Sequence, residues 1–135
     1  MFLVDIIDSC SSVIIYRDDV SRQFDNGDEN YNAILQGWNN MTSCAIEMPA
    51  YCVSIDKLTR EQIKNGNWVE FIFDGVCEFN SMPFEKLLVQ VEDNYCGFNL
   101  IRYTSNEGYS GRCFYLQLHN GNMSGFNMIL KNISI

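Results

Sequence analysis

Apolar and polar residues alternate along much of the second half of the chain, with the period of two that β-strands show when one face is buried. In CFYLQLHN, for example, Phe114, Leu116 and Leu118 share one face, and the residues between them occupy the other. The same alternation is found in WVEFIFD, VCEF, KLLVQVED, FNLIRYT and GFNMILKNISI. One buried and one partly polar face is typical of antiparallel strands, so this half predicts an antiparallel sheet that continues into the last residues.

Two turn dipeptides, Asp74-Gly75 and Asn120-Gly121, divide these runs. Both are strong signals for the type I′ turn, because asparagine, aspartate and glycine tolerate its left-handed backbone. They predict one hairpin between WVEFIFD and VCEF and another between CFYLQLHN and the C-terminal segment. Further strands are predicted in the first half by runs rich in β-branched residues, namely FLVDIID, SVIIYRD and AYCVSID (residues 50–56).

The first half also contains the spacing of an amphipathic helix near residues 29–41. Its apolar stripe consists of Tyr31, Ile34, Leu35, Trp38 and Met41. These positions recur at the intervals that place side chains on one face of an α-helix. Asp28 or Asn30 is suited to cap the helix, and the carboxylates of Asp28 and Glu29 favour the positive end of its dipole.

A second, short helix is predicted near residues 59–65. Thr59 and Gln62 have the spacing of a capping box, and Gly66 is placed as a C-terminal stop. The chain has two prolines, no internal repeat and no linker, so we expect a single domain spanning residues 1–135. The predicted class is α+β, with a mostly antiparallel sheet of about six to eight strands and a curved or barrel-like sheet as a variant.

The composition is that of an acidic globular domain. Hydrophobic residues make up 47% of the chain, and 17 acidic residues against 9 basic ones give a net charge of −8. This charge repels phosphate backbones and anionic membranes and attracts basic partners. Arg102, Arg112 and Lys131 lie near several tyrosines, but the surrounding carboxylates oppose nucleic-acid binding. We therefore expect neither nucleic acid nor membrane as a partner.

The N-terminal residues MFLVDIID do not resemble a secretory signal. They lack a basic n-region, and Asp5 and Asp8 interrupt what would be the apolar region. No uninterrupted apolar run approaches the ~18 residues that a membrane helix needs. Taken as the native start, this segment predicts a cytoplasmic protein.

Six cysteines are the most numerous reactive side chains, but their spacing does not indicate a catalytic or metal site. They are Cys10, Cys44, Cys52, Cys77, Cys96 and Cys113, and none forms a Cys-x-x-Cys pair. The single histidine, His119, directly precedes a predicted turn, which favours an exposed and idle side chain. Most of the thiols stand in apolar stretches and are expected to be reduced and buried, with a disulfide as the alternative. No cofactor is predicted.

Carboxylates keep two kinds of chemistry open. Glu70 and Glu78 flank the Asp74-Gly75 turn among phenylalanines, and a pair that faced each other would suit a small glycosidase-like enzyme. The alternative is that both point outward from the sheet. For calcium, no start at Asp18, Asp19 or Asp25 supplies both the glycine and the glutamate of an EF-hand loop. We therefore predict no catalytic residue and no metal site, and a protein that is not an enzyme.

The remaining distinctive feature is an acidic stretch, residues 18–29, followed directly by the aromatic helix. Carboxylates steer basic partners, and tyrosine and tryptophan are the anchors that dominate interface energies. The predicted partner-binding residues are Asp18, Asp19, Asp25, Asp28, Glu29, Tyr31 and Trp38. They predict a protein-binding inhibitor that neutralises a basic partner.

In size, acidity and lack of an active-site motif the chain resembles small bacterial immunity proteins, including those of contact-dependent growth inhibition. The resemblance covers the whole chain loosely, includes the general look of VEFIFDGVCEFN through NLIRYTSNEGYSGRCFYLQL, and rests on no motif. It implies a cognate toxin domain as the partner, basic and of the nuclease kind, bound by a protein that is a monomer on its own. An acidic secretion chaperone, which would form a dimer, or a phage-encoded inhibitor is the alternative binding protein.

Overall fold

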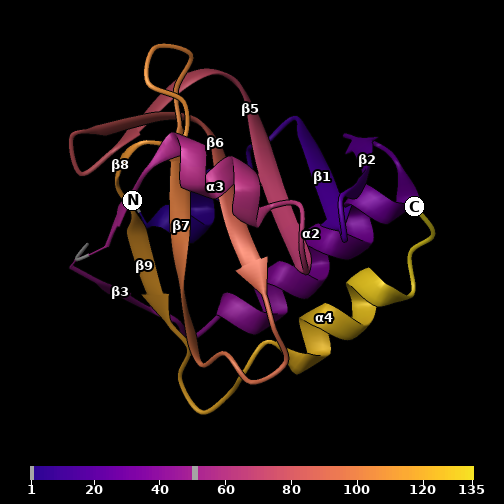
Figure 1. Ribbon diagram of the computed structural model, residues 1–135. Coiled ribbons are helices and arrows are strands. Elements are labelled where there is room, and N and C mark those ends of the chain that lie inside the picture. Colours follow the sequence, from indigo (N-terminus) through magenta and orange to yellow (C-terminus); the bar gives the residue numbers. More distant parts are fainter. Residues whose placement is uncertain (1, 50–51) are drawn as a thin grey trace.

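The protein is built on a seven-stranded antiparallel sheet with the strand order β2-β1-β5-β6-β7-β9-β3 (Figure 1). The computed structural model describes residues 2–49 and 52–135. The strands of this sheet are β1 (Ser12–Arg17), β2 (Val20–Asp25), β3 (Ile46–Met48), β5 (Asn67–Phe79), β6 (Met82–Val91), β7 (Gly97–Tyr103) and β9 (Phe114–Gln117). A separate ribbon pairs β4 (Val53–Ser54) with β8 (Gly111–Arg112). The predicted α+β class with a mostly antiparallel sheet is confirmed.

Helices cover both faces of the sheet. They are α1 (Leu3–Ile7), α2 (Glu29–Thr42), α3 (Asp56–Gln62) and α4 (Ser124–Lys131). The main core is formed by side chains of α1, α2 and α4 packed on one face, which we call the core face, and α2 and α4 lie side by side there (Figure 1). On the opposite, outer face a smaller apolar cluster of Trp68, Leu88 and Tyr109 packs with Ile63, which follows α3.

Trp38 is at the centre of the main core. Its side chain is completely buried, and its ring makes edge-on contacts with Phe71 of β5, Phe98 of β7 and Phe126 of α4. Edge-on packing is a preferred geometry of aromatic pairs. The apolar stripe that predicted a helix near residues 29–41 therefore joins both helices of the core face to the sheet.

Both ends of the chain are helical where strands were predicted. The expected strand at residues 2–8 is α1, which buries Leu3 and Ile7 at helical spacing. The C-terminal segment forms α4, which buries Phe126 and Leu130 and leaves Met128 64% exposed. In both segments the buried apolar residues are four apart, as in a helix, and Met128 does not share a buried face with Phe126 and Leu130 as a strand would require. These two strand predictions are therefore wrong.

The predicted hairpins are also wrong, because neither Asp74-Gly75 nor Asn120-Gly121 joins two strands. β5 runs through Asp74-Gly75, where its pairing with β6 shifts register between Ile72 and Cys77. The turn that joins β5 to β6 is Asn80-Ser81, with φ of 51° and 63°. Asn120 has a φ of 57° but leads into α4 rather than into a strand.

The acidic stretch contains a strand that the sequence did not reveal. Asp18 and Asp19, with φ of 48° and 72°, turn the chain from β1 into β2, the edge strand of the sheet. α2 begins at Glu29 after the cap residue Asp28, whose carboxylate accepts a hydrogen bond from the Asn30 N–H. Asp28 as the cap, one of the two candidates, is thereby confirmed.

The region of the predicted short helix is shifted toward the N-terminus. α3 begins at Asp56, three residues before the expected start, and Thr59 is buried within it instead of capping it. The strand expected at residues 50–56 is reduced to the two residues of β4, and residues 50–51 lie outside the described part of the chain.

The Asn80-Ser81 turn gives a stability prediction. Left-handed backbone costs a residue with a β-carbon roughly 1–2 kcal/mol, and glycine is free of this cost. Ser81→Gly is therefore expected to raise the free energy of unfolding by about 1 kcal/mol in urea denaturation. The matched control is Ser21→Gly in β2, an exposed strand position, which is expected to lower it by roughly 0.5–1 kcal/mol. Equal effects at the two sites would contradict the turn assignment.

Candidate functional site

Glu70 is a completely buried carboxyl group in the middle of the sheet. Its neighbours Val69 and Phe71 belong to the main core, so the alternation of β5 turns Glu70 toward the outer face. One carboxyl oxygen accepts a hydrogen bond from the Tyr16 hydroxyl at 2.7 Å, and the other accepts one from the Tyr109 hydroxyl. The two tyrosines satisfy the carboxyl group that burial removes from water.

Burial and the neighbouring Glu70 carboxylate raise the pKa of both tyrosines. Removal from water is the larger cause for Tyr16 and for Tyr109, and the charge of Glu70 adds to it. Both hydroxyls therefore remain protonated donors to Glu70 over the whole physiological pH range.

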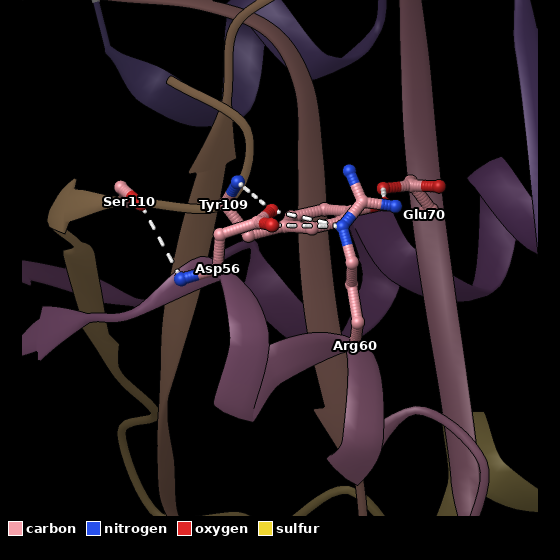
Figure 2. A network of polar contacts seen from close by, with 5 residues as sticks. All are labelled: Asp56, Arg60, Glu70, Tyr109 and Ser110. Carbon is pink, nitrogen blue, oxygen red and sulfur yellow. Dashed lines mark hydrogen bonds and ion pairs between the residues drawn. The ribbon is translucent and has the colours of Figure 1, made fainter.

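A second group of polar contacts fastens α3 beside this cluster (Figure 2). The Asp56 carboxylate, at the first residue of α3, accepts hydrogen bonds from the Arg60 guanidinium at 2.9 and 3.0 Å and from the Tyr109 N–H at 2.8 Å. The Asp56 N–H in turn donates to the Ser110 hydroxyl at 3.3 Å. The Tyr109 N–H and the Arg60 guanidinium hold the pKa of Asp56 below its usual value.

Arg60 links the two groups, because its guanidinium carbon lies 5.4 Å from the centre of the Tyr109 ring. Tyr109 thus contacts Glu70 through its hydroxyl, Asp56 through its backbone and Arg60 through its ring. We call Tyr16, Asp56, Arg60, Glu70 and Tyr109 the outer-face network. It ties α3 and the segment before β8 to the centre of the sheet.

A groove of about 390 Å³ opens between α3, the β4-β8 ribbon and the outer face of the sheet. Its lining residues are uncharged: Cys52, Val53, Ser54, Ile55, Leu58, Thr59, Gln62, Trp68, Gln90, Tyr95, Gly97, Phe98, Asn99, Ile101, Cys113 and Tyr115. Val53, Ile55 and Leu58 are 64%, 57% and 57% exposed. The groove therefore combines amide and aromatic side chains with an aliphatic edge that faces solvent.

One polar atom of the groove has no hydrogen-bond partner among the described residues. The side-chain oxygen of Asn99, on β7, is buried without a donor. Buried acceptors in folded proteins are normally paired, so this oxygen is an exception beneath the surface of the groove.

The expected juxtaposition of Glu70 and Glu78 across a hairpin is wrong. The two residues lie on the same continuous strand, eight positions apart, which corresponds to ~26 Å at about 3.3 Å per residue. Glu78 is exposed, whereas both oxygens of Glu70 are bound by tyrosines. A glycosidase pair requires carboxyl groups within about 10 Å, so these two do not form one.

Two of the predicted partner-binding residues are not on the surface. Tyr31 is only 4% exposed and donates its hydroxyl to the carbonyl oxygen of Cys10, and Trp38 is completely buried. Both belong to the main core, which corrects the prediction that they anchor a partner. Their helical stripe is the face that α2 packs on the sheet.

The five predicted carboxylates are exposed but do not form one cluster. Asp18 and Asp19 occupy the turn before β2, whereas Asp25 ends β2, ~20 Å from Asp19 at about 3.3 Å per residue, and Asp28 and Glu29 follow it. Several have local partners: Asp18 accepts from the Gly66 N–H and Asp25 from the Ser12 hydroxyl. Hydrogen bonds from Gln23 and Ser12 lower the pKa of Asp25.

All six cysteines are free thiols, and burial raises the pKa of Cys10 and of Cys113 to about 11. Residues 2–49 and 52–135 contain no group of three or more His, Cys, Asp or Glu side chains arranged to hold a metal ion. Within the same ranges, every helix is too short or too polar to cross a membrane.

No family model, curated protein or solved structure matches the chain.

The hydrogen bonds to Glu70 give a stability prediction. Tyr109→Phe removes one of the two donors and keeps the ring that packs on Trp68 and Leu88. Hydrogen bonds to charged groups contribute about 1.5–3 kcal/mol, so we expect the free energy of unfolding in urea at pH 7 to fall by that amount. The matched control is Tyr95→Phe, whose hydroxyl is 3.5 Å from Gln90, and we expect it to cost less than about 1 kcal/mol.

The raised tyrosine pKa values predict a dependence on alkaline pH. A hydroxyl that ionises at pH 10.0 when unfolded and at higher pH when folded contributes stability below pH 10.0, and this contribution is lost as the pH rises further. In Tyr16→Phe the decline of unfolding free energy above pH 10 is expected to be shallower by up to about 1.4 kcal/mol per pH unit. Identical slopes for wild type and variant between pH 10 and 11.5 would contradict the buried arrangement.

Proposed function

We propose that the protein is a binding module that neutralises a basic protein partner, in the manner of an immunity protein paired with a nuclease toxin domain. The observation that carries the proposal is the uncharged groove with its exposed aliphatic edge of Val53, Ile55 and Leu58. In a chain of net charge −8, a concave surface free of charged side chains is suited to close contact with another molecule.

The chemistry of the groove supports a protein as the bound molecule. Centres of protein interfaces are depleted of charged residues and enriched in aromatic ones, as in the part lined by Trp68, Tyr95 and Tyr115. The exposed aliphatic edge extends the apolar surface beyond the pocket itself, over an area that a larger partner would cover.

The charge distribution supports a basic partner. The ion pairs found among the described residues join Arg60 to Asp56, Lys64 to Glu61 and Lys131 to Asp93. None of these involves Asp18, Asp19, Asp25, Asp28 or Glu29, which are all exposed. Such a negative field accelerates encounter with a basic protein over a Debye length of about 8–10 Å, even where the carboxylates lie outside the contact itself.

The groove gives the first test of this function. Wild type, Leu58→Asp and Met128→Asp are immobilised and exposed to a lysate of the organism that makes the protein. The wild-type and Met128→Asp columns are expected to capture a basic protein. The Leu58→Asp column is expected to capture at least tenfold less of it than the wild-type column. Met128 is the matched control, since it is 64% exposed on α4, away from the groove. An acidic captured protein, or equal capture by all three columns, would refute the proposal.

The carboxylates give the second test, with the captured basic protein as partner. Converting Asp18, Asp19, Asp25 and Asp28 to lysine is expected to lower the association rate constant by on the order of tenfold or more at low salt, and much less at 0.5 M salt. Asp28→Ser and Asp25→Asn provide a milder variant that keeps the helix cap and the Ser12 contact. An association rate that is insensitive to both charge and salt would exclude electrostatic steering.

A further inference from the structure

Cys52 and Cys113 lie opposite each other at the end of the β4-β8 ribbon. The antiparallel register pairs Ser54 with Gly111 and Val53 with Arg112, and the next pair in this ladder is Cys52 with Cys113. The Cys113 N–H donates to the Cys52 carbonyl oxygen at 2.9 Å, which continues the ladder by one position. The two cysteines are 61 residues apart in sequence but are direct cross-strand neighbours.

The two thiols are on the same side of the ribbon. Paired residues of antiparallel strands point to the same face, and both cysteines line the groove. Burial raises the pKa of the Cys113 thiol, and the nearby Cys52 thiol raises it further. Hydrogen-bonded antiparallel pairs have Cα atoms about 5.5 Å apart, and disulfides span about 4.4–6.8 Å. The backbone is thus already within the range that a disulfide requires.

We propose that Cys52 and Cys113 form a site of reversible oxidation, which closes to a disulfide when the protein meets a low-molecular-mass disulfide such as oxidised glutathione. This inference is independent of the proposed partner. In the first step the Cys52 thiolate attacks one glutathione sulfur, so that a mixed disulfide forms and one reduced glutathione leaves. In the second step the Cys113 thiol loses its proton and attacks the Cys52 sulfur, which releases the second glutathione.

Exposure determines the order of the two steps. Cys52 is half-buried at the groove and accessible to a small disulfide, whereas Cys113 is 1% exposed. Cys113 therefore acts as the resolving thiol, shielded from glutathione until Cys52 has reacted.

The other cysteines have different neighbours. Cys10 is buried with its sulfur 3.8 Å from the Tyr31 hydroxyl, and the Cys96 sulfur is 3.8 Å from the Asn94 carbonyl oxygen. Cys44 is exposed beside Ser43. The exposed thiols of Cys44 and Cys96 are expected to take up glutathione and to keep it unless a second thiol resolves the mixed disulfide.

The bond would brace a short ladder of the fold. The β4-β8 ribbon contains two residue pairs and forms one wall of the groove. Val53 of β4 lies at the exposed edge of this wall. Closing Cys52 onto Cys113 constrains the unfolded chain over a loop of about 60 residues, so the oxidised protein is expected to unfold at a higher urea concentration than the reduced one.

The experiment incubates the folded, reduced wild-type protein with oxidised glutathione, alkylates the remaining thiols and maps the products by mass spectrometry without reduction. Cleavage after Glu47 separates Cys44 from Cys52 and makes the assignment unambiguous. The expected product is a peptide containing Cys52 joined to a peptide containing Cys113, with the loss of two hydrogen atoms. Reduced glutathione in excess is expected to reopen the bond.

Two variants separate the two steps. In Cys113→Ser the mixed disulfide at Cys52 is expected to accumulate, and in Cys52→Ser the Cys113 thiol is expected to stay unmodified. The inference is overturned if wild-type Cys52 carries glutathione without a link to Cys113, if both thiols remain reduced, or if either pairs with a different cysteine. The wild-type map decides these outcomes even if one serine variant does not fold.

Discussion

The buried carboxyl group of Glu70 is the constraint on which the outer half of the molecule depends. Placing such a group in the middle of a sheet is costly unless its oxygens are hydrogen-bonded, and water has no access to it there. The donors come from Tyr16 on β1 and from Tyr109, which precedes β8. A polar position inside β5 thus requires the distant segment around Tyr109 to fold down onto the sheet.

This requirement also positions the groove. Tyr109 holds the Asp56 carboxylate through its backbone, and Asp56 opens α3. The next residues of the same helix, Leu58, Thr59 and Gln62, form the groove wall. The polar contacts are therefore on one side of α3, and the groove wall is on another. The outer-face network fixes the geometry of the groove although its residues are mostly not part of the groove lining. Arg60 reinforces the arrangement by stacking against the Tyr109 ring.

The strands and helix that could be predicted from the sequence are those with a long, regular pattern. The period of two extends over enough residues to exclude a helix in residues 86–93, 98–104 and 113–120. The apolar stripe of α2 is likewise long enough to exclude a strand. α1 and α4 were missed because five to eight apolar-rich residues fit both periods, and tertiary packing decides between them. At Asp74-Gly75 a strong local turn signal was overridden by the long pairing of β5 with β6.

The candidate site was largely beyond local sequence signals. Its residues extend from Cys52 to Tyr115 and meet only through strand pairing and the docking of α3. Glu70 stands out in the sequence among the aromatics of β5, but its burial and its tyrosine partners, 54 and 39 residues away, could not be predicted. Tyr31 and Trp38 illustrate the converse, because large aromatic side chains next to acidic residues suit both an interface and a core. Only burial distinguishes the two roles.

The strand order has a consequence for synthesis on the ribosome. β3 is an edge strand of the sheet and pairs with β9, and Ile46 leaves the ribosome 68 residues before Phe114 does. β1, similarly, has its inner neighbour β5 more than fifty residues downstream. Because these strand partners are so widely separated in sequence, the sheet cannot be completed until β9 has been translated. Its early apolar segments lack their sheet partners during that interval, and exposed apolar surface of this kind favours aggregation of an incomplete chain.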